Sequence, residues 1–140
     1  AYSYKMTFHY KYQEDKMSKS KGTISIENKW DEDFKKVEII YQSSEDDVDK
    51  AFITYNIRAQ QTHNDVFDIE YSSTGKSSWI GTVTTSSGQK WSSGSPLKCN
   101  ANKAENCKII IKFDEYRKEM GVIYTPQNSC HKKMSQLKSI

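Results

Sequence analysis

Apolar and polar residues alternate along several short stretches of this chain, most visibly between residues 65 and 91. Apolar side chains occupy every second position over residues 67–71 and again over residues 79–83, and the turn-forming segment SSTGKSS lies between them. A period of two places the apolar side chains on one face of a half-buried strand. The pattern therefore predicts two β-strands joined in a hairpin with one apolar and one polar face.

The same alternation predicts further short strands. Residues 2–12 show it most regularly, with aromatic or methionine side chains at every even position. Residues 51–57 carry strand-forming residues on both faces, which favours a central place in a sheet. The tail from His131 to Ile140 is predicted as a short helix, because Met134 and Leu137 are three residues apart. The other predicted strands are residues 23–30, 37–41, 109–113 and 122–125.

About eight short strands separated by polar turns are typical of an all-β protein, here an antiparallel β-sandwich. At 140 residues the chain can bury one core, so we expect a single domain over residues 1–140. Nine Tyr, five Phe and three Trp supply large rings for that core.

The charge pattern argues against nucleic acid as a partner. The 21 basic and 18 acidic residues leave a net charge of +3, and both signs are mixed along the chain. Only Arg58 and Arg117 carry the guanidinium group that phosphate and base recognition favours. The sequence contains no stretch of 18 apolar residues, so no membrane-spanning helix is predicted. The chain begins at Ala1, as a secreted protein does after signal-peptide removal, so we expect an extracellular location.

The three cysteines fit such a location but leave the pairing open. Cys99 and Cys107 frame the polar loop NANKAEN, and a disulfide between them would close it and leave Cys130 unpaired. A bridge from Cys130 to either of the others would leave the remaining thiol free. We take Cys99–Cys107 as the first expectation. An unpaired Cys130 could link two chains in a homo-oligomer.

Two acidic loops are candidates for a Ca²⁺ site, with Asp31, Asp33, Asp46 and Asp47 as the possible ligands. Their spacing matches no EF-hand loop, and a run of charges is more often a solvated surface. The solvated interpretation is therefore favoured and no metal or other cofactor is expected.

Aromatic residues near loops are the best candidates for ligand binding. Trp79 lies in strand register and is predicted to be in the core, whereas Trp91 follows a polar turn and is predicted to be more exposed. A ring of this kind gives sugars a flat apolar surface with a polar edge. The predicted ligand-binding residues are Trp91, Gln89, Trp30 and Asn64.

Catalytic signatures are missing from the sequence. His9, His63 and His131 are scattered, and Cys130 beside His131 is poorly spaced to chelate one ion. We find no nucleophile elbow and no glycine-rich phosphate loop. The sequence therefore predicts a protein that is not an enzyme.

Four short segments resemble a known layout. They are Ile24–Asn28, Val37–Ile39, Tyr71–Gly75 with Trp79, and Asn128–Cys130. The layout resembles the small secreted β-sandwich domain of nematodes and fungi described as up-regulated in long-lived insulin-receptor mutants, and more loosely the aegerolysin-type sandwiches. This resemblance covers residues 22–132 and implies an extracellular all-β module with no catalytic residues to carry over.

Three functions remain after these exclusions. The leading hypothesis is a secreted, lectin-like module that binds glycans or a cell surface through loop aromatics. The second is a lipid-binding or membrane-damaging protein, because exposed aromatics and lysines also suit a membrane surface. The third is a structural or interaction protein.

Overall fold

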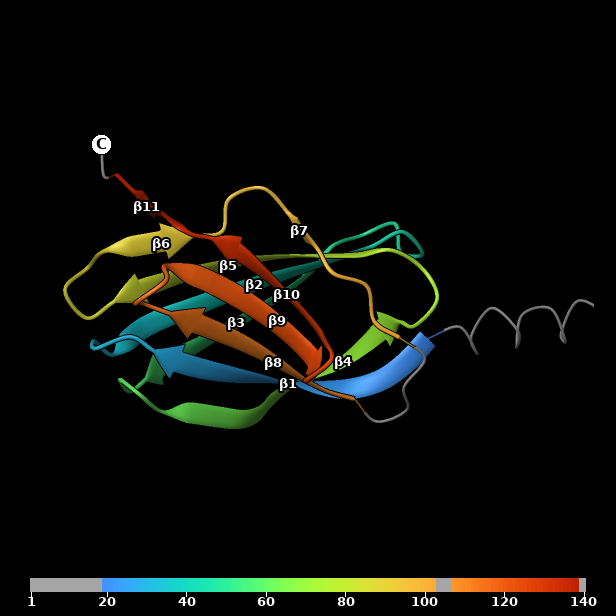
Figure 1. Cartoon of the computed structure of the whole chain (residues 1–140), viewed down its shortest axis with the longest axis horizontal. Coiled ribbons are helices and arrows are strands. Elements are labelled where there is room, and N and C mark those ends of the chain that lie inside the picture. Colours follow the sequence, from blue (N-terminus) through green and yellow to red (C-terminus); the bar gives the residue numbers. More distant parts are fainter. Residues whose placement is uncertain (1–18, 103–106, 139–140) are drawn as a thin grey trace, which may run out of the picture.

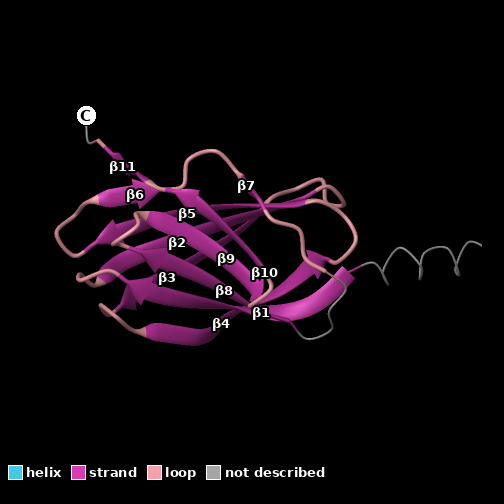
Figure 2. Cartoon of the chain, in the orientation of Figure 1, coloured by secondary structure: helices cyan, strands magenta, loops and turns pink. Residues whose placement is uncertain are grey.

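The computed structural model describes residues 19–102 and 107–138, which form strands, turns and loops (Figure 2). The all-β prediction is confirmed for these residues, while the strand predicted at residues 2–12 lies outside them. The strands of the described residues are β1 (Lys19–Lys29), β2 (Phe34–Ser43), β3 (Lys50–Ile57), β4 (Thr62–Ser72), β5 (Ser77–Thr85), β6 (Lys90–Ser92), β7 (Leu97–Lys98), β8 (Cys107–Asp114), β9 (Glu119–Thr125), β10 (Asn128–Lys133) and β11 (Ser135–Leu137).

The strands form two sheets, one in front of the other (Figure 1). The first sheet has the order β10-β9-β8-β1-β4, and the second has the order β11-β6-β5-β2-β3 with β7 also paired to β5. All neighbouring strands are antiparallel except β1 and β8, which run parallel. No helix among the described residues is long and apolar enough to cross a membrane.

The core lies between the sheets, and side chains from both belong to one hydrophobic cluster. Buried and half-buried positions alternate strictly along β5, as the period of two in the sequence predicted for a strand with one face on the core. Phe34 of β2 meets Phe113 of β8 edge to face, with ring centroids 5.7 Å apart. Trp79 is fully buried, as predicted. Aromatic pairs across the gap therefore hold the two sheets together.

The hairpin predicted for residues 65–91 is wrong, although both of its strands exist. β4 pairs with β1 in the first sheet, and β5 pairs with β2 in the second. The turn between Ser72 and Ser77 therefore carries the chain from one sheet to the other. Alternation fixes which face of a strand is buried, but two strands that face one core from opposite sheets share the same pattern.

Two further predictions of position were also wrong. β3 is an edge strand of its sheet, and Ile53 and Tyr55 on its outer face are 46% and 59% exposed. The tail is extended rather than helical, with β10 paired to β9 and β11 paired to β6. Met134 lies buried between these two strands, where the chain changes sheets. A short isolated helix is only marginally stable. The tail instead forms backbone hydrogen bonds with the edge strands of both sheets.

Candidate functional site

Trp91 lies at one end of the core, on β6, where Val83 of β5 and Gln136 of β11 are its neighbours. Its side chain is half-buried and packs against Trp30, with ring centroids 5.8 Å apart. Trp30 is 1% exposed. Trp30 therefore packs beneath Trp91 on the side of the core and exposes no ring surface to a sugar. The prediction that Trp30 binds a ligand is wrong for this reason.

Lys118 covers the same pair of rings. Its ammonium lies 5.1 Å from the ring centroid of Trp30 and 5.2 Å from that of Trp91. The distances are within the range of cation–π attraction. Lys118 has a φ of 51°, in the left-handed region, and its ammonium also lies 3.7 Å from Glu115 Oε2. These contacts hold the Trp91 ring in place.

Gln89 contacts the nitrogen edge of the Trp91 indole. The Trp91 Nε1 group donates a hydrogen bond to Gln89 Oε1 at 3.3 Å. Gln89 also lines a shallow hollow of about 450 Å³ between the turn after β5 and the C-terminal strand β11. We call it the Gln89 hollow, and its other lining residues are Ser87, Gly88, Gln136, Leu137 and Lys138. Trp91 and Gln89, two of the predicted ligand-binding residues, are therefore in contact, although Trp91 does not line the hollow.

Asn64 lies elsewhere. It belongs to β4, the outermost strand of the other sheet, and its side-chain oxygen accepts a hydrogen bond from Lys108 Nζ at 2.8 Å. The structure therefore does not bring Asn64 together with Trp91 and Gln89. Gln136 and Leu137, which do join Gln89, were missed because the tail was predicted to be helical.

The first acidic loop uses its carboxylates within the protein. Asp33 Oδ1 accepts a hydrogen bond from the Ala59 amide at 2.8 Å, and Asp31 Oδ1 accepts one from Gln60 Nε2 at 3.2 Å. Glu32 Oε1 accepts the Ser87 amide at 2.9 Å, and hydrogen bonding by Ser87 lowers the pKa of the Glu32 carboxyl. This loop therefore ties neighbouring turns together.

The second acidic loop is paired with lysines. Asp46 Oδ1 lies 2.5 Å from Lys19 Nζ, and Asp46 Oδ2 lies 3.9 Å from Lys50 Nζ. Its neighbour Asp47 is exposed. Within residues 19–102 and 107–138, no group of three His, Cys, Asp or Glu side chains is arranged to hold a metal ion.

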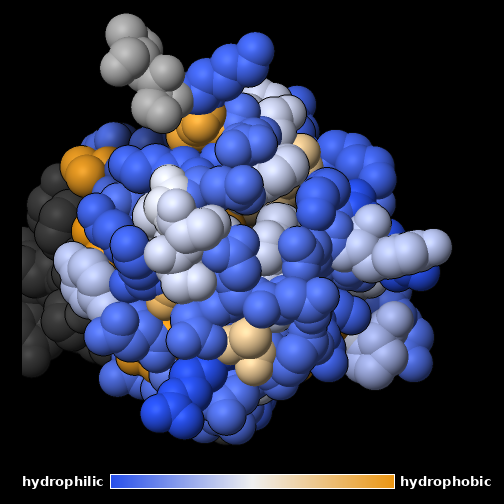
Figure 3. Space-filling model, turned by 90° about the vertical axis from the view of Figure 1, so that its left-hand side faces the viewer, coloured by the Kyte–Doolittle hydropathy of each residue, from blue (hydrophilic) through white to orange (hydrophobic). Residues whose placement is uncertain are grey.

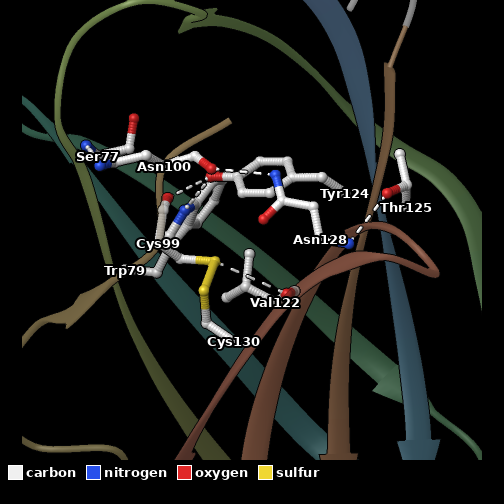
Figure 4. Close-up of a disulfide and its surroundings, with 9 residues drawn as sticks. All are labelled: Ser77, Trp79, Cys99, Asn100, Val122, Tyr124, Thr125, Asn128 and Cys130. Atoms are coloured by element: carbon white, nitrogen blue, oxygen red, sulfur yellow. Dashed lines mark hydrogen bonds between the residues drawn. A yellow bond between two sulfur atoms is a disulfide. The ribbon is translucent and has the colours of Figure 1, made fainter. Parts of the chain in front are cut away.

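A disulfide joins Cys99 to Cys130, with their Cα atoms 5.8 Å apart (Figure 4). The predicted Cys99–Cys107 pairing is therefore wrong, and the free thiol is the buried Cys107 rather than Cys130. β10 lies at the edge of the first sheet, beside β9, and this brings Cys130 to Cys99 from 31 residues away in the sequence. Strand order decided the pairing, and loop length along the chain did not.

The disulfide sits in a network of hydrogen bonds that fixes the segment after β7. The Tyr124 hydroxyl donates to the Cys99 carbonyl at 2.7 Å, and the Cys99 amide donates to the Ser77 carbonyl at 3.0 Å. Asn100 Oδ1 accepts the Ser77 amide at 2.8 Å, and the Asn100 carbonyl accepts Asn128 Nδ2 at 3.1 Å (Figure 4). This segment is thus attached to both sheets.

Comparison with models of known protein families gave no match, and a search of curated proteins gave none either. The resemblance noted from the sequence therefore stays a prediction.

Proposed function

We propose that this protein is a secreted, non-enzymatic β-sandwich module that binds glycans at the Gln89 hollow. The observation that carries the proposal is the hydrogen bond from Trp91 Nε1 to Gln89 Oε1, which orients the Gln89 amide at the rim of the hollow. Among the described residues, the Gln89 NH₂ group has no hydrogen-bond partner. That group is therefore available to a ligand hydroxyl.

The chemistry of the hollow suits a sugar. Gln89 and Gln136 offer amide donors and acceptors, and Ser87 adds a hydroxyl. Leu137 is 49% exposed and offers an apolar contact to the C–H face of a sugar ring. The volume of about 450 Å³ falls within the usual size of small-ligand sites. The end of the molecule that carries this turn is mostly hydrophilic, with isolated apolar positions (Figure 3).

The distribution of exposed apolar side chains favours a glycan over a lipid surface. Among the described residues the exposed large apolar side chains are Val48, Ile53, Tyr55, Tyr116 and Leu137. Only Ile53 and Tyr55 share an element, and the others lie on separate loops or strands. Membrane docking generally needs such residues gathered on one face.

An extracellular setting is part of the proposal. Structural disulfides persist in oxidising compartments and are uncommon in the cytosol, so the Cys99–Cys130 bond supports it.

A glycan array tests the proposal, screened with and without Ca²⁺. We expect binding to one class of neutral glycans, and we expect Gln89→Ala to weaken it about 5–10-fold, as the loss of one hydrogen bond does. Gln127→Ala removes the same amide from an exposed turn and is the matched control. An array with no signal above background in either condition would overturn the proposal. Liposome flotation separates it from the lipid-binding alternative.

A further inference from the structure

A second hollow lies beside the disulfide. It has a volume of about 400 Å³ and is formed where the end of β2, the start of β5, and β7 with the residues that follow it meet. Its lining consists of four serines, one glutamine, one asparagine and two lysines. We call it the Lys76–Lys98 hollow. It shares no lining residue with the Gln89 hollow.

The two lysines give this hollow a positive charge. Lys76 and Lys98 are both exposed, and neither forms an ion pair with a carboxylate of the described residues. The two nearby carboxylates, Glu45 and Asp49, do not line the hollow, and both are hydrogen-bonded within the protein. Glu45 Oε1 accepts a hydrogen bond from Thr74, and Asp49 Oδ2 accepts one from Gln42 Nε2 at 3.1 Å. An anion entering the hollow would therefore meet two ammonium groups.

Both lysine-bearing segments are fixed. The Ser44 amide donates to the Lys76 carbonyl at 2.9 Å, and the Lys76 amide donates to Ser44 Oγ at 2.9 Å. On the other wall, Lys98 precedes Cys99, which is bonded to Cys130 and to the Ser77 carbonyl. Because these backbone positions are already fixed, less conformational entropy is lost when a ligand binds. The walls are thus formed before any ligand arrives.

We propose that the Lys76–Lys98 hollow binds an anionic saccharide, a sugar that carries a carboxylate or a sulfate group. The ammonium groups of Lys76 and Lys98 pair with the anion, because charge-assisted hydrogen bonds are the stronger kind. Gln42 Nε2 and Asn100 Oδ1 are already hydrogen-bonded within the protein, to Asp49 and to the Ser77 amide. Gln42 Oε1, Asn100 Nδ2 and the Ser78 hydroxyl, which have no hydrogen-bond partner among the described residues, are left for the remaining sugar hydroxyls. The volume accommodates a ligand at the lower end of the usual small-ligand range.

Amide NMR titrations of the whole chain test this proposal. The probes are glucuronate, N-acetylneuraminate and glucose 6-sulfate, each against glucose and against sodium sulfate at equal ionic strength. We expect at least one acidic sugar to cause saturable shifts at the Ser77, Ser78 and Asn100 amides, with glucose at least tenfold weaker. Glucose binding as tightly as every acidic sugar would overturn the role of charge. Sodium sulfate binding as tightly would overturn the assignment of a saccharide.

Substitutions locate the site. Lys76→Gln and Lys98→Gln should each weaken the acidic sugar about tenfold, as expected for the loss of one charge-assisted hydrogen bond. Lys35→Gln makes the same charge change at an exposed position of β2 outside the hollow and should leave affinity unchanged. An equal loss in Lys35→Gln would show that only net charge matters and would overturn the site. Gln89→Ala should leave the acidic-sugar titrations unchanged. Failure of the Lys76–Lys98 proposal can therefore be told apart from failure of the proposal for the Gln89 hollow.

Discussion

Trp79 Nε1 donates a hydrogen bond to the Tyr124 hydroxyl at 2.9 Å, and this bond connects β5 of one sheet with β9 of the other. The same hydroxyl donates to the Cys99 carbonyl at 2.7 Å. Tyr124 therefore satisfies the buried indole group and also anchors the segment that carries Lys98 (Figure 4). A buried donor without a partner would be costly, so the hydroxyl contributes to both the core and the proposed anion site.

Removing this hydroxyl should destabilise the fold. We expect Tyr124→Phe to lower the free energy of unfolding by about 1–3 kcal/mol, because it leaves the Trp79 indole N–H buried without an acceptor. Urea denaturation followed by tryptophan fluorescence measures the change. Tyr116→Phe removes a hydroxyl from a side chain that is 94% exposed and should have almost no effect. Equal stability of Tyr124→Phe and the natural chain would contradict the role given to the bond.

Buried tyrosines should make the protein sensitive to alkali. Burial raises the pKa of Tyr71 to about 12 from an ordinary value of 10.0, and burial also raises the pKa of Tyr124. The folded state then holds a proton that the unfolded chain has lost. This stabilisation is complete below about pH 10 and falls as the pH rises towards about 12, with a slope near 1.4 kcal/mol per pH unit per tyrosine.

Urea denaturation at a series of pH values across that window measures the slope, and tyrosinate absorbance of the folded protein reports the titration itself. Tyr71→Phe should reduce the slope. A free energy of unfolding that stays constant over the window would show that these tyrosines titrate alike in both states.

The disulfide should contribute to stability and to the proposed anion site together. Because Cys99 and Cys130 are 31 residues apart, replacing both by alanine should lower the free energy of unfolding by about 3–4 kcal/mol through loop entropy. We also expect weaker binding of the acidic sugar, since the wall that holds Lys98 loses its covalent anchor. Denaturation with and without reductant measures the first effect, and the NMR titration measures the second.

Cys107→Ala keeps the disulfide and is the control for this pair. Unchanged acidic-sugar affinity in the folded double variant would show that hydrogen bonds alone position Lys98.

The free thiol should be unreactive in the folded protein. Cys107 is 8% exposed, and burial raises the pKa of its thiol, so little thiolate is available. We expect one thiol per chain to react with maleimide in denaturant and almost none without it. Rapid labelling of the native protein, or a disulfide-linked dimer on a non-reducing gel, would contradict the buried placement of Cys107.

Gly22 should be intolerant of any side chain. It lies opposite Cys107 in the parallel pair of β1 and β8, and a Cβ there would collide with the Cys107 backbone carbonyl and lie 3.1 Å from the Tyr71 ring. The Cys107 carbonyl belongs to the backbone of β8, so it cannot move aside as the end of a flexible side chain could. We expect Gly22→Ala to lower the free energy of unfolding by about 2–3 kcal/mol, against little change for the adjacent exposed Lys21→Ala. Thermal denaturation of the two variants compares them, and equal melting temperatures would show that β1 and β8 can separate at this point.

The fold class could be predicted from the sequence because alternation reports local geometry. Every second residue of β5 faces the core whatever sheet β5 belongs to, so Trp79 and Val83 were placed correctly inside. Trp91 and Gln89 are in contact because only Lys90 lies between them in the chain. These are properties of neighbours along the chain.

The rest depended on contacts between distant segments. Only the tertiary structure decided that β4 and β5 belong to different sheets, that Trp30 lies beneath Trp91, and that β10 carries Cys130 to Cys99. The Lys76–Lys98 hollow also forms only when three separate segments meet at one end of the second sheet. A strand's alternation fixes which side chains point inward but says nothing of which backbone lies beside it, because that choice is made by the packing of the whole core.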